Sequence, residues 1–97
     1  MQLLSHETFA ARANETFDLG MGESAMPLTL VEVQPLTTHA YPGMLRSPFS
    51  LMFRSGSPVV LPQKVYRLKN ATMGLVDIFL VPVGRDVSGV VYQAVFN

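Results

Sequence analysis

The chain has no cysteine and few charged residues, and both deficits limit its chemistry. Without cysteine it has no disulfide framework, no thiolate metal site and no cysteine nucleophile. Charged residues make up 14% of its 97 residues, whereas hydrophobic residues make up 48%. Because an ordinary soluble domain is about 25% charged, this surface is either rich in uncharged polar side chains or partly covered. We therefore expect a protein partner or a homo-oligomer.

Clusters of basic residues and long apolar segments are also missing. Seven basic and seven acidic residues give a net charge of zero, and the basic residues are spread along the chain. The chain therefore lacks the positive field that nucleic-acid binding requires. No apolar run approaches the roughly 20 residues of a membrane-spanning helix, and the first residues do not follow the pattern of a signal peptide. We expect a cytoplasmic protein that binds neither nucleic acid nor membrane.

The order of polar and apolar residues predicts one β-rich domain over residues 1–97. Ser5 as N-cap and the alanines behind it predict one short helix over residues 5–13, with Asn14 ending it. From 15 to 97, short alternating segments recur roughly every ten to fifteen residues, separated by Gly, Pro or Asn. This spacing predicts an all-β fold, a small antiparallel barrel or sandwich of five to seven strands.

Two segments give specific expectations about the strands. In 49–54, Phe49, Leu51 and Phe53 alternate with other side chains, which is typical of a half-buried strand. In the segment 28–34 the alternation breaks after Leu30, and a β-bulge near Leu30-Val31 would return its apolar residues to one face.

The most apolar segment is 75–83, and its β-branched and aromatic residues favour a central strand. We expect it to pair as a hairpin with the last strand, 90–96. Its second face, which carries Asp77, Phe79 and Val81, is also largely apolar. We therefore expect part of that second face to be covered.

Few residues offer catalytic or metal-binding chemistry. The chain has two histidines and no zinc-ligand spacing, so we expect neither a metal nor another cofactor. No serine lies in a nucleophile elbow. An enzyme would depend on His39 with Asp77 or Glu32 as its acid–base groups. A structural ion pair of either acid with Arg54 or Arg67 accounts better for these acids. We assign no catalytic residue and favour a protein that is not an enzyme.

Residues 36–48 form a connection too long for an ordinary turn, and such loops are often functional. The segment mixes aromatic, apolar and charged side chains that can contact a ligand or a partner. The candidate contact residues are His39, Tyr41, Met44, Leu45 and Arg46.

Four sequence blocks combine strand-forming residues with proline or polar positions: Ser47 to Arg54, Leu61 to Leu68, Ile78 to Gly84, and Tyr92 to Asn97. Through these blocks the chain resembles a family of small bacterial all-β proteins, a domain of unknown function. The resemblance covers nearly the whole chain. It implies a stand-alone bacterial β domain and carries over no catalytic residue.

Three functions fit these features. The low charge and the two-faced apolar segment 75–83 favour a small structural or protein-interaction module of a bacterial assembly. One alternative is a small-ligand-binding β-barrel, with a pocket lined by Tyr41, Tyr66 and Tyr92 and covered by residues 36–48. The other alternative is an enzyme of unknown reaction.

Overall fold

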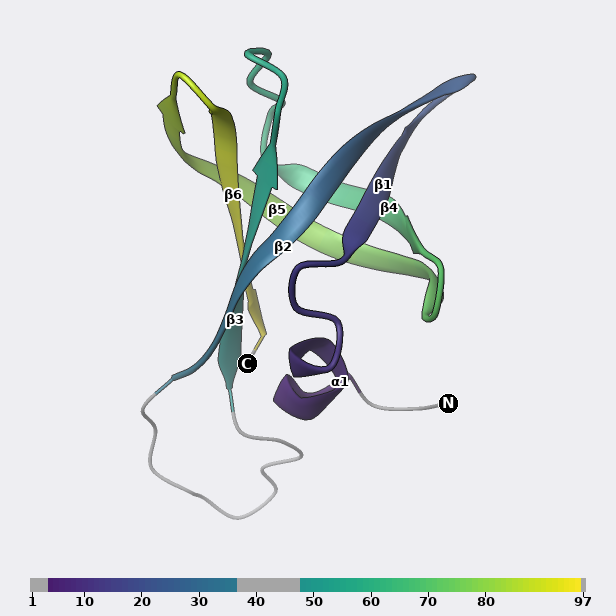
Figure 1. Cartoon of the computed structure of the whole chain (residues 1–97), viewed down its shortest axis with the longest axis vertical. Coiled ribbons are helices and arrows are strands. Elements are labelled where there is room, and N and C mark those ends of the chain that lie inside the picture. The colour runs from purple at the N-terminus through teal and green to yellow at the C-terminus, as the bar shows by residue number, and fades with distance from the viewer. Residues whose placement is uncertain (1–3, 37–47, 97) are drawn as a thin grey trace.

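The computed structural model describes residues 4–36 and 48–96, and it confirms the all-β prediction. Within these residues, six antiparallel strands form a closed barrel with one short helix at its lower end (Figure 1). The order of strands around the barrel is β1-β2-β3-β6-β5-β4, so the fold is a barrel and not an open sandwich. In chain order the elements are α1 (His6–Ala10), β1 (Thr16–Met21), β2 (Ser24–Pro35), β3 (Phe49–Ser55), β4 (Lys64–Asn70), β5 (Gly74–Asp86) and β6 (Gly89–Phe96).

Two long strands, β2 and β5, each divide their pairing between two neighbours. Residues 24–29 of β2 pair with β1, and residues 28–35 pair with β3. Residues 74–80 of β5 pair with β4, and residues 81–86 pair with β6. Each long strand therefore passes from one half of the barrel to the other, which is how orthogonally packed sheets form corners.

A β-bulge lies close to each of these two transitions. The register of β2 against β3 shifts between Leu30 and Glu32, which confirms the predicted bulge near Leu30-Val31. The expected return of both valines to the core face is wrong for Val31, which is exposed, whereas Val33 packs partly buried against the core. The register of β5 against β6 shifts between Pro82 and Gly84, a second bulge that the sequence did not indicate. An extra residue on one strand increases its local bend and twist, so both bulges help the long strands to turn.

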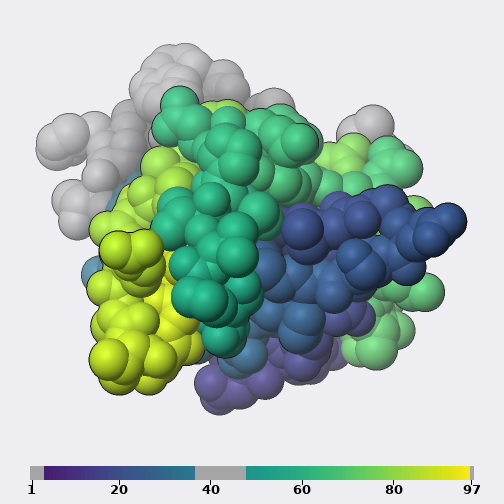
Figure 2. Space-filling view, turned by 90° about the horizontal axis from the view of Figure 1, so that it is seen from above, coloured from purple at the N-terminus to yellow at the C-terminus, as the bar shows by residue number. Residues whose placement is uncertain are grey.

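The barrel closes where β1 meets β4, and this seam is short. Its register consists of Asp18 opposite Lys69 and Leu19 opposite Leu68. The β1–β2 hairpin continues beyond these pairs and projects from one side of the molecule (Figures 1 and 2). The predicted hairpin between 75–83 and 90–96 is confirmed as the pair β5–β6.

The core lies inside the barrel, and α1 covers its lower end. Ser5 caps the helix as predicted, with its Oγ accepting a hydrogen bond from a backbone N–H of the first turn. Phe9 is fully buried, and its ring lies 6.3 Å from Phe17, 5.9 Å from Phe49 and 5.5 Å from Phe96. Aromatic pairs at such distances stabilise a core beyond their buried area.

The helix is shorter than the predicted range of 5–13. It ends at Ala10, and the N–H of Arg12 then donates to the carbonyl three residues back, 2.8 Å away. Asn14 follows with a φ of +69°, and its N–H donates to the carbonyl of Leu30 at 2.7 Å. The tertiary contact with β2 therefore replaces the last helical turn, although Asn14 does mark the stop. Among the described residues, no helix has the length and apolar composition that crossing a membrane requires.

Candidate functional site

Tyrosine hydroxyls hold the connection between β3 and β4 to the upper end of the barrel. Tyr92 is fully buried; its hydroxyl accepts from the N–H of Leu61 at 3.1 Å and donates to the carbonyl of Val59 at 3.4 Å. The Tyr66 hydroxyl donates to the carbonyl of Pro62, and burial raises its pKa. The two tyrosines expected to line a ligand pocket are therefore bonded to the protein's own backbone.

Removing the Tyr92 hydroxyl tests this role. We expect Tyr92→Phe to lower the free energy of unfolding by about 1–3 kcal/mol, because the N–H of Leu61 loses its partner. Urea denaturation measures the loss. Tyr66→Phe is the matched control and should lose less, since its hydroxyl donates to the carbonyl of Pro62, an exposed residue. A stable Tyr92→Phe variant would show that the hydroxyl does not hold the connection.

The outer side of β4 and of the first half of β5 forms a second, solvent-exposed feature. Side chains of successive strand residues point to opposite faces, so Tyr66, Leu68, Ile78 and Leu80 are buried while their neighbours point outward. We call the outward set the β4–β5 face, and it consists of Val65, Arg67, Lys69, Leu75, Asp77 and Phe79. In Figure 1 the two strands cross behind β1 and β2.

The apolar side chains of the β4–β5 face are unusually exposed. Val65 lies opposite Phe79 in the register, and they are 58% and 51% exposed. Leu75, opposite Lys69, is 64% exposed. We expected part of this side of β5 to be covered. Within the described chain only Val81 of that side is partly buried, whereas Asp77 and Phe79 are exposed.

The centre of the face is an ion pair. Arg67 Nε donates to Asp77 Oδ1 at 3.0 Å, and Nη2 donates to Oδ2 at 3.4 Å. These hydrogen bonds lower the pKa of Asp77 and raise that of Arg67, so both groups are charged at neutral pH. The predicted pairing of Asp77 with Arg67 is confirmed, whereas Arg54 pairs with Asp86 at 2.9 Å. An exposed pair of this kind contributes little to stability, so its charges are available to a partner.

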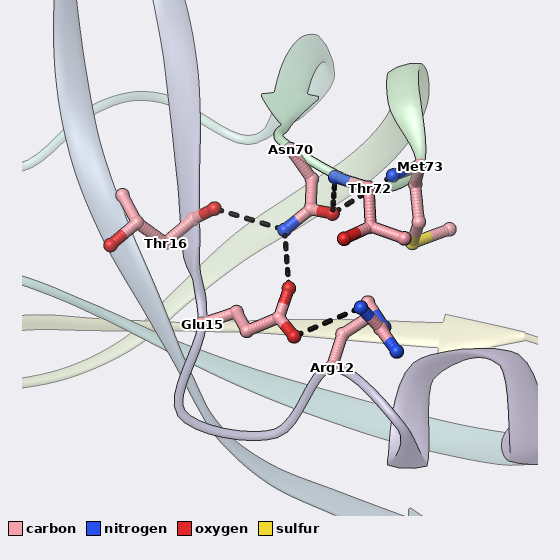
Figure 3. A network of polar contacts seen from close by, with 6 residues as sticks. All are labelled: Arg12, Glu15, Thr16, Asn70, Thr72 and Met73. Atoms are coloured by element: carbon pink, nitrogen blue, oxygen red, sulfur yellow. Dashed lines mark hydrogen bonds and ion pairs between the residues drawn. The ribbon is translucent and has the colours of Figure 1, made fainter.

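A polar network at the lower end links the β4–β5 turn to the start of β1 (Figure 3). Asn70 is 3% exposed; its amide nitrogen donates to Glu15 Oε1 and to the carbonyl of Thr16, both at 3.1 Å. Its amide oxygen accepts from the N–H groups of Thr72 and Met73, both at 2.9 Å. All of its hydrogen-bonding capacity is used within the chain, so the network is structural.

The network extends to the turn after α1. Arg12 Nη1 lies 3.0 Å from Glu15 Oε2, and both side chains are partly buried. The sequence indicated only that Gly, Pro or Asn separates the strands. The position of Asn70 between β4 and the turn that follows it is the signal that predicts its bonding to backbone groups.

The predicted contact residues fall outside the part of the chain that the structure describes. His39, Tyr41, Met44, Leu45 and Arg46 belong to the segment 37–47. The acid–base group that the enzyme alternative would need, His39, therefore also lies outside the described residues. At the ends of this connection, the N–H of Leu36 donates to the carbonyl of Pro48 at 3.0 Å. Among the described residues, no three His, Asp or Glu side chains gather as a metal-ligand set.

Comparison with known proteins identifies the family. A family model described as Domain of unknown function (DUF6916) matches residues 4–96, and the chain belongs to this family. A search of curated proteins and a search of solved structures each gave no match.

Proposed function

We propose that this protein is a small structural or protein-interaction module of a bacterial assembly, acting in the cytoplasm, and that the β4–β5 face is its contact surface. The observation that carries the proposal is the exposed apolar pair Val65–Phe79, with Leu75 nearby, beside the Arg67–Asp77 ion pair. Aromatic residues and arginine are enriched at the centres of protein interfaces. Exposed apolar side chains grouped on one face are typical of a surface that a partner covers.

The closed barrel supports contact through a face rather than through a strand edge. Each of the six strands has a hydrogen-bonded neighbour on both sides. A partner that adds a strand needs a free sheet edge, and closure leaves only short unpaired stretches, such as those of β1 and β4 on either side of their two-pair seam. Contact through side chains therefore fits the barrel better, and the β4–β5 face offers both apolar and charged ones.

Site-specific photo-crosslinking, carried out in the cells that naturally produce this protein, tests the proposal. We expect a benzoylphenylalanine at position 79 to give a discrete covalent adduct with a protein, identified by mass spectrometry, because Phe79 would lie in the contact. The matched control is the same probe at Val31, an apolar residue that is also exposed but lies at the bulge of β2. The proposal fails if position 79 gives no adduct, or only the adducts that position 31 gives.

A further inference from the structure

The β4–β5 face carries the charge pattern of a surface that is complementary to itself. Its central row contains one cation and one anion, Arg67 and Asp77, with side chains 66% and 52% exposed. One flanking row pairs Val65 with Phe79. The whole chain has a net charge of zero, so two copies experience little long-range repulsion.

Symmetry decides how such a face can stack on a second copy. In a twofold contact the same patch is used twice, and the axis direction determines which residues meet. An axis across the strands, along the Arg67–Asp77 row, would place Arg67 over Arg67 of the partner subunit and Asp77 over Asp77 of the partner subunit. Like charges would then meet. An axis parallel to the strands, midway between β4 and β5, exchanges the two strands instead. It then places Arg67 over Asp77 of the partner subunit.

The same axis also matches the apolar residues. Because Val65 and Phe79 are opposite each other in the register, the exchange places each of them over the other in the second copy. Lys69 comes over Leu75 of the partner subunit, where the aliphatic part of the lysine can cover the leucine. A single twofold axis therefore brings opposite charges together in the central row and places apolar groups in contact in both flanking rows.

We propose that the occupant of the β4–β5 face is a second copy of this chain, bound about a twofold axis parallel to β4 and β5. This inference rests on the proposed function, since it names the partner of the same surface. The face is small, and interfaces below about 1,200 Å² are generally weak or transient. We expect a dissociation constant on the order of 10–100 µM.

Charge reversal in the full-length protein tests the geometry. Sedimentation velocity from roughly 1 to 500 µM should show the wild-type mass rising from one copy to two across the expected range. We expect Arg67→Asp and Asp77→Arg each to weaken the dimer at least about tenfold, because like charges then meet across the axis. Both variants should fold, since the exposed pair contributes little to stability.

Two further combinations distinguish a second copy from any other occupant. The double variant Arg67→Asp/Asp77→Arg should regain the dimer, because every opposite-charge contact is rebuilt with its signs exchanged. An equimolar mixture of the two single variants should form a heterodimer for the same reason. Arg54→Asp and Asp86→Arg reverse a second ion pair of the described residues, which joins β3 to β5 across β6, and are the matched controls; they should dimerise like wild type.

The failures of the two proposals differ. A wild-type protein that stays monomeric throughout the range overturns the second-copy inference, while a crosslink from position 79 to a different protein would still support the contact surface. Dimers that tolerate both single charge reversals, or a mixture that remains monomeric beside a wild-type dimer, overturn the proposed axis.

Discussion

Replacing Asn70 with aspartate is expected to destabilise the barrel by about 3–5 kcal/mol at pH 7, the cost of an uncompensated buried charge. The two side chains have nearly the same shape, so the N–H groups of Thr72 and Met73 keep their acceptor. The amide nitrogen, which donates hydrogen bonds, is replaced by a carboxylate oxygen, which accepts them. It then faces Glu15 Oε1 and the carbonyl of Thr16, which accept hydrogen bonds from the amide in the native chain.

The effect of this substitution should depend on pH in a characteristic direction. Burial and the Glu15 carboxylate both oppose ionisation, so the pKa of the new aspartate rises above its unfolded value of about 3.9. The folded state then binds more protons than the unfolded state, and stability falls as pH rises through this window. We therefore expect the deficit relative to wild type to shrink when the pH is lowered from 7 toward 4.

Urea denaturation at several pH values measures this effect, and two variants separate its causes. Asn70→Ala removes the same amide without adding a titratable group, so its deficit should vary less with pH than that of Asn70→Asp, and any remaining dependence reflects the lost hydrogen bond to the Glu15 carboxylate. Adding Glu15→Gln to Asn70→Asp should recover part of the loss, because the neutral amide can donate to the new carboxylate. A pH-independent deficit in Asn70→Asp would contradict the burial of this network.

Gly89→Ala is expected to cost more than about 4 kcal/mol, or to prevent folding altogether. Gly89 begins β6 with a φ of +130°, a conformation that side chains of L-residues rarely adopt. A Cβ built there would lie 1.7 Å from the carbonyl oxygen of Ser55 and 2.8 Å from its carbonyl carbon. Neither atom can rotate away, because Ser55 belongs to β3 and is fully buried, so β3 and β6 would have to separate.

Two other glycines provide a graded control for this prediction. Gly84→Ala meets no atom within 4 Å and should change the stability by less than about 0.5 kcal/mol. Gly74 also meets open space but has a φ of +76°, so Gly74→Ala should cost about 1–2 kcal/mol from backbone strain alone. Circular dichroism and thermal unfolding rank the three variants. If Gly89→Ala is no less stable than Gly74→Ala, the close approach of β6 to Ser55 is refuted.

Local patterns predicted the strands well, because apolar residues alternate with other residues along a strand, and this alternation is visible in a few neighbouring residues. The alternation of Phe49, Leu51 and Phe53 predicted their burial. The break in alternation after Leu30 predicted the bulge, which leaves Val31 exposed and returns Val33 toward the core.

Contacts between distant segments could not be read from such patterns. The end of α1 depends on the carbonyl of Leu30, which takes the N–H of Asn14. The tight approach at Gly89 depends on the pairing of β6 with β3, which are far apart in the chain. Composition left barrel and sandwich open, because both bury the same alternating residues.

The candidate site was predicted only in part. Asp77 and Arg67 were among the possible partners, but a choice between Arg67 and Arg54 requires the register of β4 against β5. The same register places Val65 opposite Phe79, so the β4–β5 face as a whole is visible only in the folded chain.

The short seam between β1 and β4 has a consequence for the order of folding. Three hairpins, β1–β2, β4–β5 and β5–β6, join strands that follow each other in the chain, so they can form early from local contacts. Closing β1 onto β4 joins residues about fifty positions apart and gains a ladder of only two residue pairs. The pairing of β1 with β4 is therefore unfavourable until the three hairpins have formed. Asn70 lies at the end of β4, and its amide donates to the carbonyl of Thr16 in β1. This hydrogen bond then stabilises the closed barrel beside the short seam.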